Sequence, residues 1–411
     1  MKITTVHARQ IFDSRGMPTI EAEVRLENGI CGMGIAPSGA STGSNEAHER
    51  RDGKTSYLGR SVLDAVALVN DEIASRLSGM RADEQLQVDQ ALVELDGTPN
   101  RERLGGNSLI AVSLAAADAA ARQAGLPLYR WVGGLQGSEL PCPMMNVING
   151  GAHAGNNIDI QEFMIVPEGA ENFQEAMRMG MECYHALKKL LREDGLNIAV
   201  GDEGGFAPDL QGDEQALEYL VRAIERAGYR PGEDVSLALD AAAGEWWSGE
   251  DYHLPKCGQR YTNTELMEHY ERLVRRFPII SIEDPFGDED FDSFAEITQR
   301  IGDQTMIVGD DLFTTNADRL EAGIQAGAAN AILIKPNQIG TLSETLETVA
   351  LARRSGYGVI LSHRSGETES TAIADIAVAV NAEFIKAGAP ARSERLAKYN
   401  RLLRIEEELY R

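Results

Sequence analysis

Cysteine and long apolar runs are both scarce in this 411-residue sequence. Its four cysteines are scattered and lack the C-x-x-C spacing of metal or redox motifs; they are Cys31, Cys142, Cys183 and Cys257. We therefore expect free thiols in a cytoplasmic protein rather than a disulfide framework. No apolar run reaches the length of a membrane span, and the chain opens directly into strand-like sequence. A transmembrane segment and a signal peptide are therefore not expected.

Positive charge is scarce as well. The chain has 39 Lys and Arg against 64 Asp and Glu, which gives a formal net charge of −25. Such a field opposes broad contact with nucleic acid or anionic lipid, so we expect no direct nucleic-acid or membrane binding. To bind an anionic substrate, this negatively charged protein would need a site with a positive local potential, which bound metal ions can supply. The apolar share of 43% and the charged share of 25% are ordinary for a soluble globular chain, and the length suits about two domains.

Residues 1–134 have the pattern of a small α+β domain. Apolar and polar residues alternate over residues 3–34, which predicts antiparallel strands. An apolar stripe at helical spacing predicts a helix over residues 62–77. A second, alanine-rich helix is expected at 108–124, with Asn107 as its N-cap.

A loop rich in small residues lies within this domain. Residues 36–44 read A-P-S-G-A-S-T-G-S, and the backbone of such a segment can approach a ligand closely. The same composition is typical of a flexible surface connector. Composition alone does not decide between a mobile active-site loop and a connector.

The second region, residues 135–411, begins with loops that carry polar side chains next to apolar runs. His153 stands in N-G-G-A-H-A-G-N-N, just before a predicted strand that carries Gln161 and Glu162. After a long predicted helix, the run N-I-A-V is followed by G-D-E-G-G-F, with Glu203 as its second acid. Two acids and two glycines after a short apolar run indicate another strand end with close backbone approach.

The most informative pattern is a series of six apolar runs, each ending in a charged or polar residue. The end residues, 23 to 43 positions apart, are Asp240, Glu283, Asp310, Lys335, His363 and Lys386. Apolar runs at this spacing are typical of buried parallel strands in βα units, and a (βα) barrel keeps its active site at the carboxyl ends of its strands. The carboxylates suit a hard divalent cation, and the cationic groups suit an anionic substrate. The series predicts a barrel enzyme.

Short motifs in both regions carry a family resemblance. In chain order they are D-S-R-G-x-P-T, P-S-G-A-S-T-G, N-G-G-A-H-A-G, I-Q-E-F-M-I, V-G-D-E-G-G-F-A-P, S-I-E-D-P, G-D-D-L, I-K-P-N-Q-I-G-T, S-H-R-S-G-E-T-E and R-S-E-R-L-A-K-Y-N. The set resembles the enolase family over nearly the whole chain. The resemblance implies an α/β fold in which an N-terminal α+β capping domain precedes a modified TIM-type (βα)8 barrel with an atypical strand order at its start.

The resemblance also implies an activity. Enolases are hydro-lyases that reversibly dehydrate 2-phospho-D-glycerate to phosphoenolpyruvate in glycolysis and gluconeogenesis. The expected cofactor is magnesium, two ions per site, of which the second arrives with the small phosphorylated anionic substrate. The expected assembly is a homodimer or an octamer of dimers.

Roles for individual residues follow from the matched motifs. The implied ligands of the tightly held magnesium are Asp240, Glu283 and Asp310, and Ser41 is the implied ligand of the second ion. Lys335 corresponds to the base and Glu203 to the acid, with Glu162 and His363 assisting. The residues implied to line or bind the substrate are Ser41, His153, Gln161, Glu162, Lys335, His363, Arg364, Ser365 and Lys386, of which Arg364 and Ser365 contact the phosphate.

Other readings stay open. The chain departs from the family pattern at Met17, Arg60, Ser370 and Ala387, which leaves room for a divergent paralogue that acts on a related phospho- or phosphono-substrate, as a carboxyphosphonoenolpyruvate synthase does. Racemases and cycloisomerases of the broader superfamily carry a K-x-K pair that the predicted barrel lacks. A third reading is a binding protein, since enolases also serve as cell-surface plasminogen receptors and as members of RNA-degrading assemblies.

Overall fold

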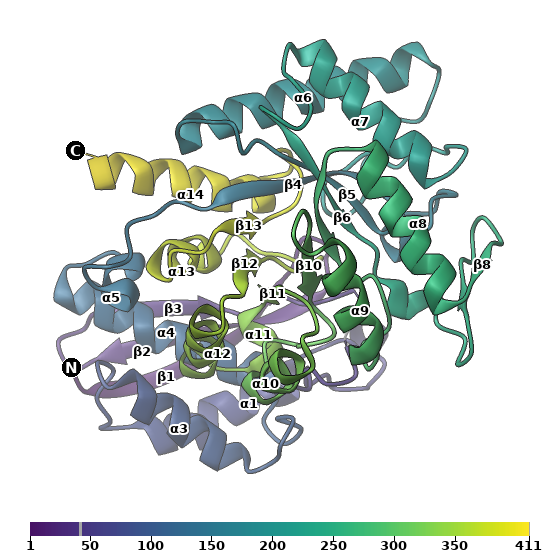
Figure 1. Ribbon diagram of the computed structural model, residues 1–411. Coiled ribbons are helices and arrows are strands. Elements are labelled where there is room, and N and C mark those ends of the chain that lie inside the picture. The colour runs from purple at the N-terminus through teal and green to yellow at the C-terminus, as the bar shows by residue number, and fades with distance from the viewer. Residues whose placement is uncertain (41–42, 411) are drawn as a thin grey trace.

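The computed structural model describes residues 1–40 and 43–410 (Figure 1). The chain begins with an antiparallel meander of β1 (Ile3–Phe12), β2 (Pro18–Leu26) and β3 (Cys31–Ile35). The alternating pattern sets its register, because Val6 pairs with Val24 on the buried face. This is the antiparallel sheet that the sequence predicts.

Helices follow this sheet in the N-terminal region, and several of them pack directly against its strands. They are α1 (Leu63–Leu68), η2 (Val69–Ile73), α2 (Ala74–Leu77), α3 (Gln85–Asp96), α4 (Gly106–Ala124) and α5 (Leu128–Gly133). The first three form one continuous helical segment with a π-helical centre, on the predicted apolar stripe.

Helix α4 lies directly on β2 and β3. Its alanines allow unusually close packing: a Cβ on Gly32 would lie 2.1 Å from the backbone nitrogen of Ala119, and one on Gly34 would lie 2.1 Å from the carbonyl oxygen of Ala111. Any side chain at Gly32 or Gly34 would push the helix off the sheet.

The rest of the chain forms a closed barrel with the order β10-β11-β12-β13-β4-β5-β6-β9. Its strands are β4 (Cys142–Asn149), β5 (Glu162–Val166), β6 (Ser236–Asp240), β9 (Ile279–Glu283), β10 (Met306–Gly309), β11 (Ala331–Ile334), β12 (Gly358–Ser362) and β13 (Phe384–Lys386). Strand β5 runs antiparallel to both of its neighbours, whereas all other pairs are parallel. The start of β5 therefore lies at the same rim as the carboxyl ends of the other strands, and Glu162 is paired with Asp240.

An outer layer of helices surrounds the barrel (Figure 1). It consists of α6 (Phe173–Glu193), α7 (Asp213–Ala227), α8 (Asn263–Arg276), α9 (Phe291–Ile301), α10 (Ala317–Ala326), α11 (Pro336–Ile339), α12 (Leu342–Arg354), α13 (Ala372–Ala379) and α14 (Ser393–Tyr410). A small hairpin, β7 (Tyr252–His253) and β8 (Arg260–Tyr261), projects between β6 and α8. The N-terminal region packs against this layer: α4 contacts α11 and α12, α3 contacts α12, and α5 contacts α13.

The six predicted strand ends lie where the sequence series places them. Asp240, Glu283 and Lys386 are the last residues of their strands, and the other three residues of the series follow their strands directly. None of the helices in residues 1–40 and 43–410 combines the length and the hydropathy that a membrane span requires.

Two local predictions are wrong. Asn107 lies inside α4, whose N-cap is Gly105, because its side-chain amide exchanges hydrogen bonds with the backbone of Arg50 instead. The N-I-A-V run does not form a barrel strand: residues 200–206 are a loop closed by an isolated bridge between Val200 and Phe206. Glu203 therefore reaches the barrel rim from a loop between α6 and α7.

Candidate active site

A cavity of about 320 Å³ opens at the carboxyl-terminal rim of the barrel. The predicted site residues that line it are His153, Gln161, Glu162, Glu203, Asp240, Asp310, Lys335, His363, Arg364, Ser365 and Lys386. The small-residue loop of the N-terminal region covers part of it, through Gly39, Ala40, Gly43 and Ser44. Ser41 lies outside the described residues. The structure thus gathers side chains from both regions of the chain around one cavity.

The Lys386 ammonium is surrounded by carboxylates on one side of this cavity. It donates to Asp240 Oδ2 at 2.9 Å and to both oxygens of Glu283 at 2.8 and 2.9 Å, and it lies 3.3 Å from Glu162 Oε2. Burial disfavours the ammonium form, yet these carboxylates hold the pKa of Lys386 well above its ordinary value. Burial and the neighbouring Asp240 raise the pKa of Glu283. Glu283 is buried and reaches the site through this contact with Lys386.

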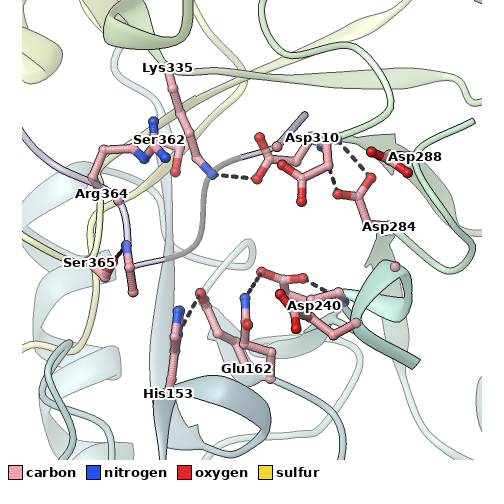
Figure 2. Close-up of a pocket in the computed structure, with 18 of the residues that line it drawn as sticks. His153, Glu162, Asp240, Asp284, Asp288, Asp310, Lys335, Ser362, Arg364 and Ser365 are labelled. Atoms are coloured by element: carbon pink, nitrogen blue, oxygen red, sulfur yellow. Dashed lines mark hydrogen bonds and ion pairs between the residues drawn. The ribbon is translucent and has the colours of Figure 1, made fainter. Parts of the chain in front are cut away.

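A second group of carboxylates surrounds Asp310. Lys335 donates to Asp310 Oδ2 (Figure 2). Burial disfavours the Asp310 carboxylate, but the cations around it, with Lys335 the strongest, together lower the pKa of Asp310. Oxygens of Asp284, Asp310 and Asp311 all lie within 4.8 Å of one another. Burial and the other two carboxylates raise the pKa of Asp284 well above its ordinary value, and burial with Asp310 raises the pKa of Asp311 to about 7.

These residues fit a divalent cation. The three buried carboxylates at the ends of β6, β9 and β10 outnumber the two ammonium groups beside them, those of Lys335 and Lys386. Carboxylate oxygens are the ligands that hard divalent cations prefer. Lys386 bridges Asp240 and Glu283, whereas Lys335 holds Asp310. The predicted arrangement of these three carboxylates in one coordination sphere stays a prediction.

Across the cavity, Glu203 lies among neutral and cationic groups. Asn146 Nδ2 donates to Glu203 Oε2 at 2.9 Å, and Oε1 is 3.6 Å from His153 Nδ1 and 3.8 Å from His363 Nε2. Burial and the Glu203 charge raise the pKa of Glu162 well above its ordinary value. Burial opposes ionisation of Glu203 too, but the neighbouring histidines and cationic side chains hold its pKa below its ordinary value. The surroundings therefore favour ionisation of Glu203 and the protonated form of Glu162.

Arg364 and Ser365 lie at the edge of the cavity nearest the small-residue loop (Figure 2). The Arg364 guanidinium donates to both oxygens of Glu46, at 2.8 and 3.1 Å, and to Asn337 Oδ1 at 3.2 Å. Ser365 Oγ accepts a hydrogen bond from the backbone nitrogen of Ala40 at 2.7 Å. This contact connects the loop directly to the barrel segment that carries Arg364.

Several residues at or beside the cavity were not singled out by the sequence patterns. Asp284 and Asp311 are two of them, and three more contact predicted site residues. Asn146 is a polar residue within an otherwise apolar strand, a signal that could have drawn attention to it. Arg395 lies in the R-S-E-R-L-A-K-Y-N motif and contacts His363 from α14. Glu46 gives no local signal, because its partner Arg364 is 318 positions away in the chain.

Comparison with protein-family models gives two matches that together span nearly the whole chain. Residues 3–132 match the N-terminal domain of enolase, and residues 138–411 match the enolase C-terminal TIM barrel domain. The two matched segments contain the N-terminal sheet with its helices and the complete barrel, respectively. The expected boundary between residues 134 and 135 stays a prediction.

Proposed function

Because this chain belongs to the enolase family, we propose that it catalyses the magnesium-dependent, reversible dehydration of 2-phospho-D-glycerate to phosphoenolpyruvate, the enolase step of glycolysis. The observation that carries the proposal is the placement of Lys335 and the Glu162–Glu203 pair around one cavity. Lys335 follows β11, and Glu162 begins β5, four places further round the eight-stranded barrel. In Figure 2, Lys335 and Glu162 face each other across the open centre of the cavity. A base and an acid on opposite sides of a substrate are what the removal of a proton and a hydroxide from adjacent carbons requires.

Magnesium, held by Asp240, Glu283 and Asp310 and joined by a second ion at Ser41, would supply Lewis-acid stabilisation of the negative charge that develops on the substrate carboxylate. Such stabilisation matters because the proton next to a carboxylate is very weakly acidic. A lysine or histidine base combined with one or two magnesium ions is a general pattern of which the enolase superfamily is itself the standard example. In this chain the positions of His153, Gln161 and Lys386 around the same cavity suit contacts to the substrate.

Lys335 is the proposed base, and it must be neutral to accept the α-proton. In the structure its ammonium donates to Asp310; burial disfavours the charged form, but Asp310 raises the pKa of Lys335. Lys335 can therefore accept the proton only when Asp310 is engaged by other positive charge. Arg364 and Lys386 lie close enough to favour the neutral amine.

The proposed acid is Glu203, assisted by Glu162 and His363. Hydroxide is a poor leaving group, so a carboxylic acid must protonate it as the carbon–oxygen bond breaks. The raised pKa of Glu162 favours its protonated form, so Glu162 is the neighbour that supplies the proton which Glu203 passes to the leaving hydroxide. Asn146 donates to the other oxygen of Glu203 and holds the carboxyl in place. Arg364 and Ser365 are the proposed phosphate contacts, since guanidinium and hydroxyl groups bind phosphate oxygens well.

Two variants test this division of roles. We expect the wild-type protein with magnesium and 2-phospho-D-glycerate to produce the ultraviolet absorbance of the enol phosphate. Glu203→Gln should still exchange the substrate α-proton with deuterated solvent, measured by NMR, but should lose about 10²–10⁴-fold or more in dehydration. Lys335→Ala should lose both exchange and dehydration. Exchange that survives in Lys335→Ala but is absent in Glu203→Gln would reverse the assignment of base and acid.

The same assay separates the alternative substrate. A divergent paralogue would show no product from 2-phospho-D-glycerate, yet would exchange the α-proton of a related phospho- or phosphono-substrate. The departures from the family pattern at Met17 and Ser370 lie outside the residues that line the cavity. This supports 2-phospho-D-glycerate as the first substrate to assay.

A further inference from the structure

Arg395 is the largest fully buried side chain of the described residues, and it lies behind His363. From α14, its Nη1 reaches His363 Nδ1 at 2.5 Å and donates to the carbonyl oxygen of Arg364 at 2.7 Å. Its Nη2 donates to the carbonyl oxygens of Ser365 at 2.5 Å and Asp202 at 3.1 Å. One guanidinium thus joins the segment that carries His363 to the loop that carries Glu203.

The contact with His363 has a chemical consequence. A guanidinium has only N–H donors and stays charged, so the atom it touches must offer a lone pair. Nδ1 of His363 therefore cannot carry a hydrogen, and a neutral imidazole then carries it on Nε2. Nε2 faces Glu203 Oε1 at 3.8 Å. We propose that Arg395 is a positioning residue that fixes His363 as the Nε2–H tautomer, so that His363 serves the reaction as a hydrogen-bond donor and not as a proton acceptor.

The charged groups around the His363 ring favour its neutral form, in which the Nε2–H group is a hydrogen-bond donor. Glu203 is the carboxylate that faces it, and Arg395, Lys386 and Lys398 are the cations. Burial, reinforced by these cations, lowers the pKa of His363 well below its ordinary value despite the opposing charge of Glu203. The backbone nitrogen of His363 also donates to the carbonyl oxygen of Lys386 at 2.8 Å, which holds the residue in place.

The role of this tautomer in catalysis rests on the proposed function. When Glu203 has given up its proton to the leaving hydroxide, an Nε2–H donor beside Oε1 stabilises the resulting carboxylate. His153 differs, because its Nδ1 lies between Glu203 and Glu162, at 3.6 and 3.7 Å, and no arginine contact is seen for its ring among the described residues. The two histidines beside Glu203 therefore differ: among the described residues, an arginine sets the tautomer of His363 but not that of His153.

The test is the tautomer itself, read from long-range ¹H–¹⁵N correlation spectra of the histidine-labelled protein without substrate. The His363→Gln variant identifies the His363 signals. We expect an unprotonated Nδ1 and a protonated Nε2 from pH 6 to pH 9. An Nδ1–H tautomer, or an imidazolium in this range, would overturn the proposal. This spectrum does not depend on which substrate the enzyme uses, so a failure here is distinguishable from a failure of the proposed function.

Substitution of the arginine tests the cause. In folded Arg395→Met, we expect the Nε2–H signature to give way to a mixture of tautomers, whereas Arg395→Lys keeps a donor and should keep the tautomer. An unchanged Nε2–H signature in folded Arg395→Met would show that Arg395 does not set it. If Arg395→Met does not fold, the wild-type spectrum together with Arg395→Lys still decides the assignment, because loss of the Nε2–H signature in Arg395→Lys would contradict it.

Discussion

At the scale of single residues, the buried Glu46–Arg364 pair links the N-terminal region to the proposed phosphate contact. Both side chains are almost fully buried, and the two hydrogen bonds between them form a bidentate pair. Removing one partner of a buried pair leaves the other charge poorly solvated, which is strongly destabilising. A bound phosphate would supply an anion to the same guanidinium. We therefore expect the pair to couple the stability of the ligand-free protein to anion binding.

Glu46→Gln tests this coupling. We expect the variant to lose about 1–3 kcal/mol of unfolding free energy without ligand, because the amide still accepts a hydrogen bond but carries no charge. Inorganic phosphate should raise the melting temperature of the variant by more than that of the wild type, as measured by calorimetry. Glu49→Gln, which removes a partner of the more exposed Arg51, is the matched control and should show the wild-type phosphate response. An equal phosphate response in Glu46→Gln and wild type would contradict the coupling.

The sequence predicted which residues lie at the carboxyl-terminal rim of the barrel better than it predicted their hydrogen-bond partners. Asp240, Glu283 and Lys386 could be placed because each ends an apolar run, and parallel strands of a barrel end at one rim. Their hydrogen bonds could not be predicted, because those depend on which strands become neighbours. Asn146 and Arg395 come from elements that share no local pattern with Glu203 and His363, and only the closed fold brings them together.

At the scale of elements, the β7–β8 hairpin holds the loop that carries His153. Lys256, between the two short strands, donates from Nζ to the carbonyl oxygens of Gly151 at 2.7 Å and Ala154 at 2.8 Å. The backbone nitrogen of Lys256 is itself fixed by Asp159 Oδ1 at 2.8 Å. One ammonium thus closes the turn around His153 from outside the cavity.

Lys256→Met should loosen this turn. The methionine fills similar space but leaves the carbonyl acceptors of Gly151 and Ala154 without their donor. We expect faster amide hydrogen exchange over residues 150–157 and a fall in kcat of about tenfold with little change in KM, because His153 is displaced by a small distance. Arg260→Met, on the same hairpin but exposed and weakly paired with Asp251, is the control and should leave both quantities unchanged. Unchanged exchange in Lys256→Met would remove the proposed role of the hairpin.

The two wrong predictions at this scale have one physical cause. Asn107 has the side chain of a helix cap, and N-I-A-V has the composition of a strand, so both local preferences were correctly identified. Tertiary contacts decided against both preferences. The Asn107 amide pairs with the backbone of Arg50, and Val200, at the end of the N-I-A-V run, forms only an isolated bridge with Phe206. The antiparallel β5 cannot be distinguished from a parallel strand by its sequence, since it is apolar on both faces either way.

At the scale of the whole molecule, the described surface has an apolar patch that a single chain leaves uncovered. Phe12 and Tyr57 pack with ring centroids 5.7 Å apart, and Leu58 beside them is 87% exposed. Tyr57 and Leu58 both have positive φ, at 51° and 56°. A left-handed backbone conformation costs a residue of this kind roughly 1–2 kcal/mol. In an isolated chain, exposed side chains bury no apolar surface that would offset this cost. We propose that a second copy of the chain covers this patch, in the homodimer that the family resemblance implies.

Leu58→Asp tests the dimer and its interface together. Aspartate tolerates the left-handed region better than leucine, so the variant chain should fold at least as stably as the wild type while its patch becomes charged. By two-fold symmetry the substitution acts twice in each dimer, and each fully buried leucine is worth about 1.5–3 kcal/mol. We expect the dissociation constant, measured by sedimentation equilibrium, to rise at least about 100-fold. Leu86→Asp, at a 70% exposed position on α3, is the control and should leave the assembly intact.

A wild-type chain that is monomeric at micromolar concentration would contradict the dimer. A Leu58→Asp variant that dimerises as tightly as the wild type would place the interface elsewhere, and the strained, exposed Tyr57–Leu58 segment would then need a different partner.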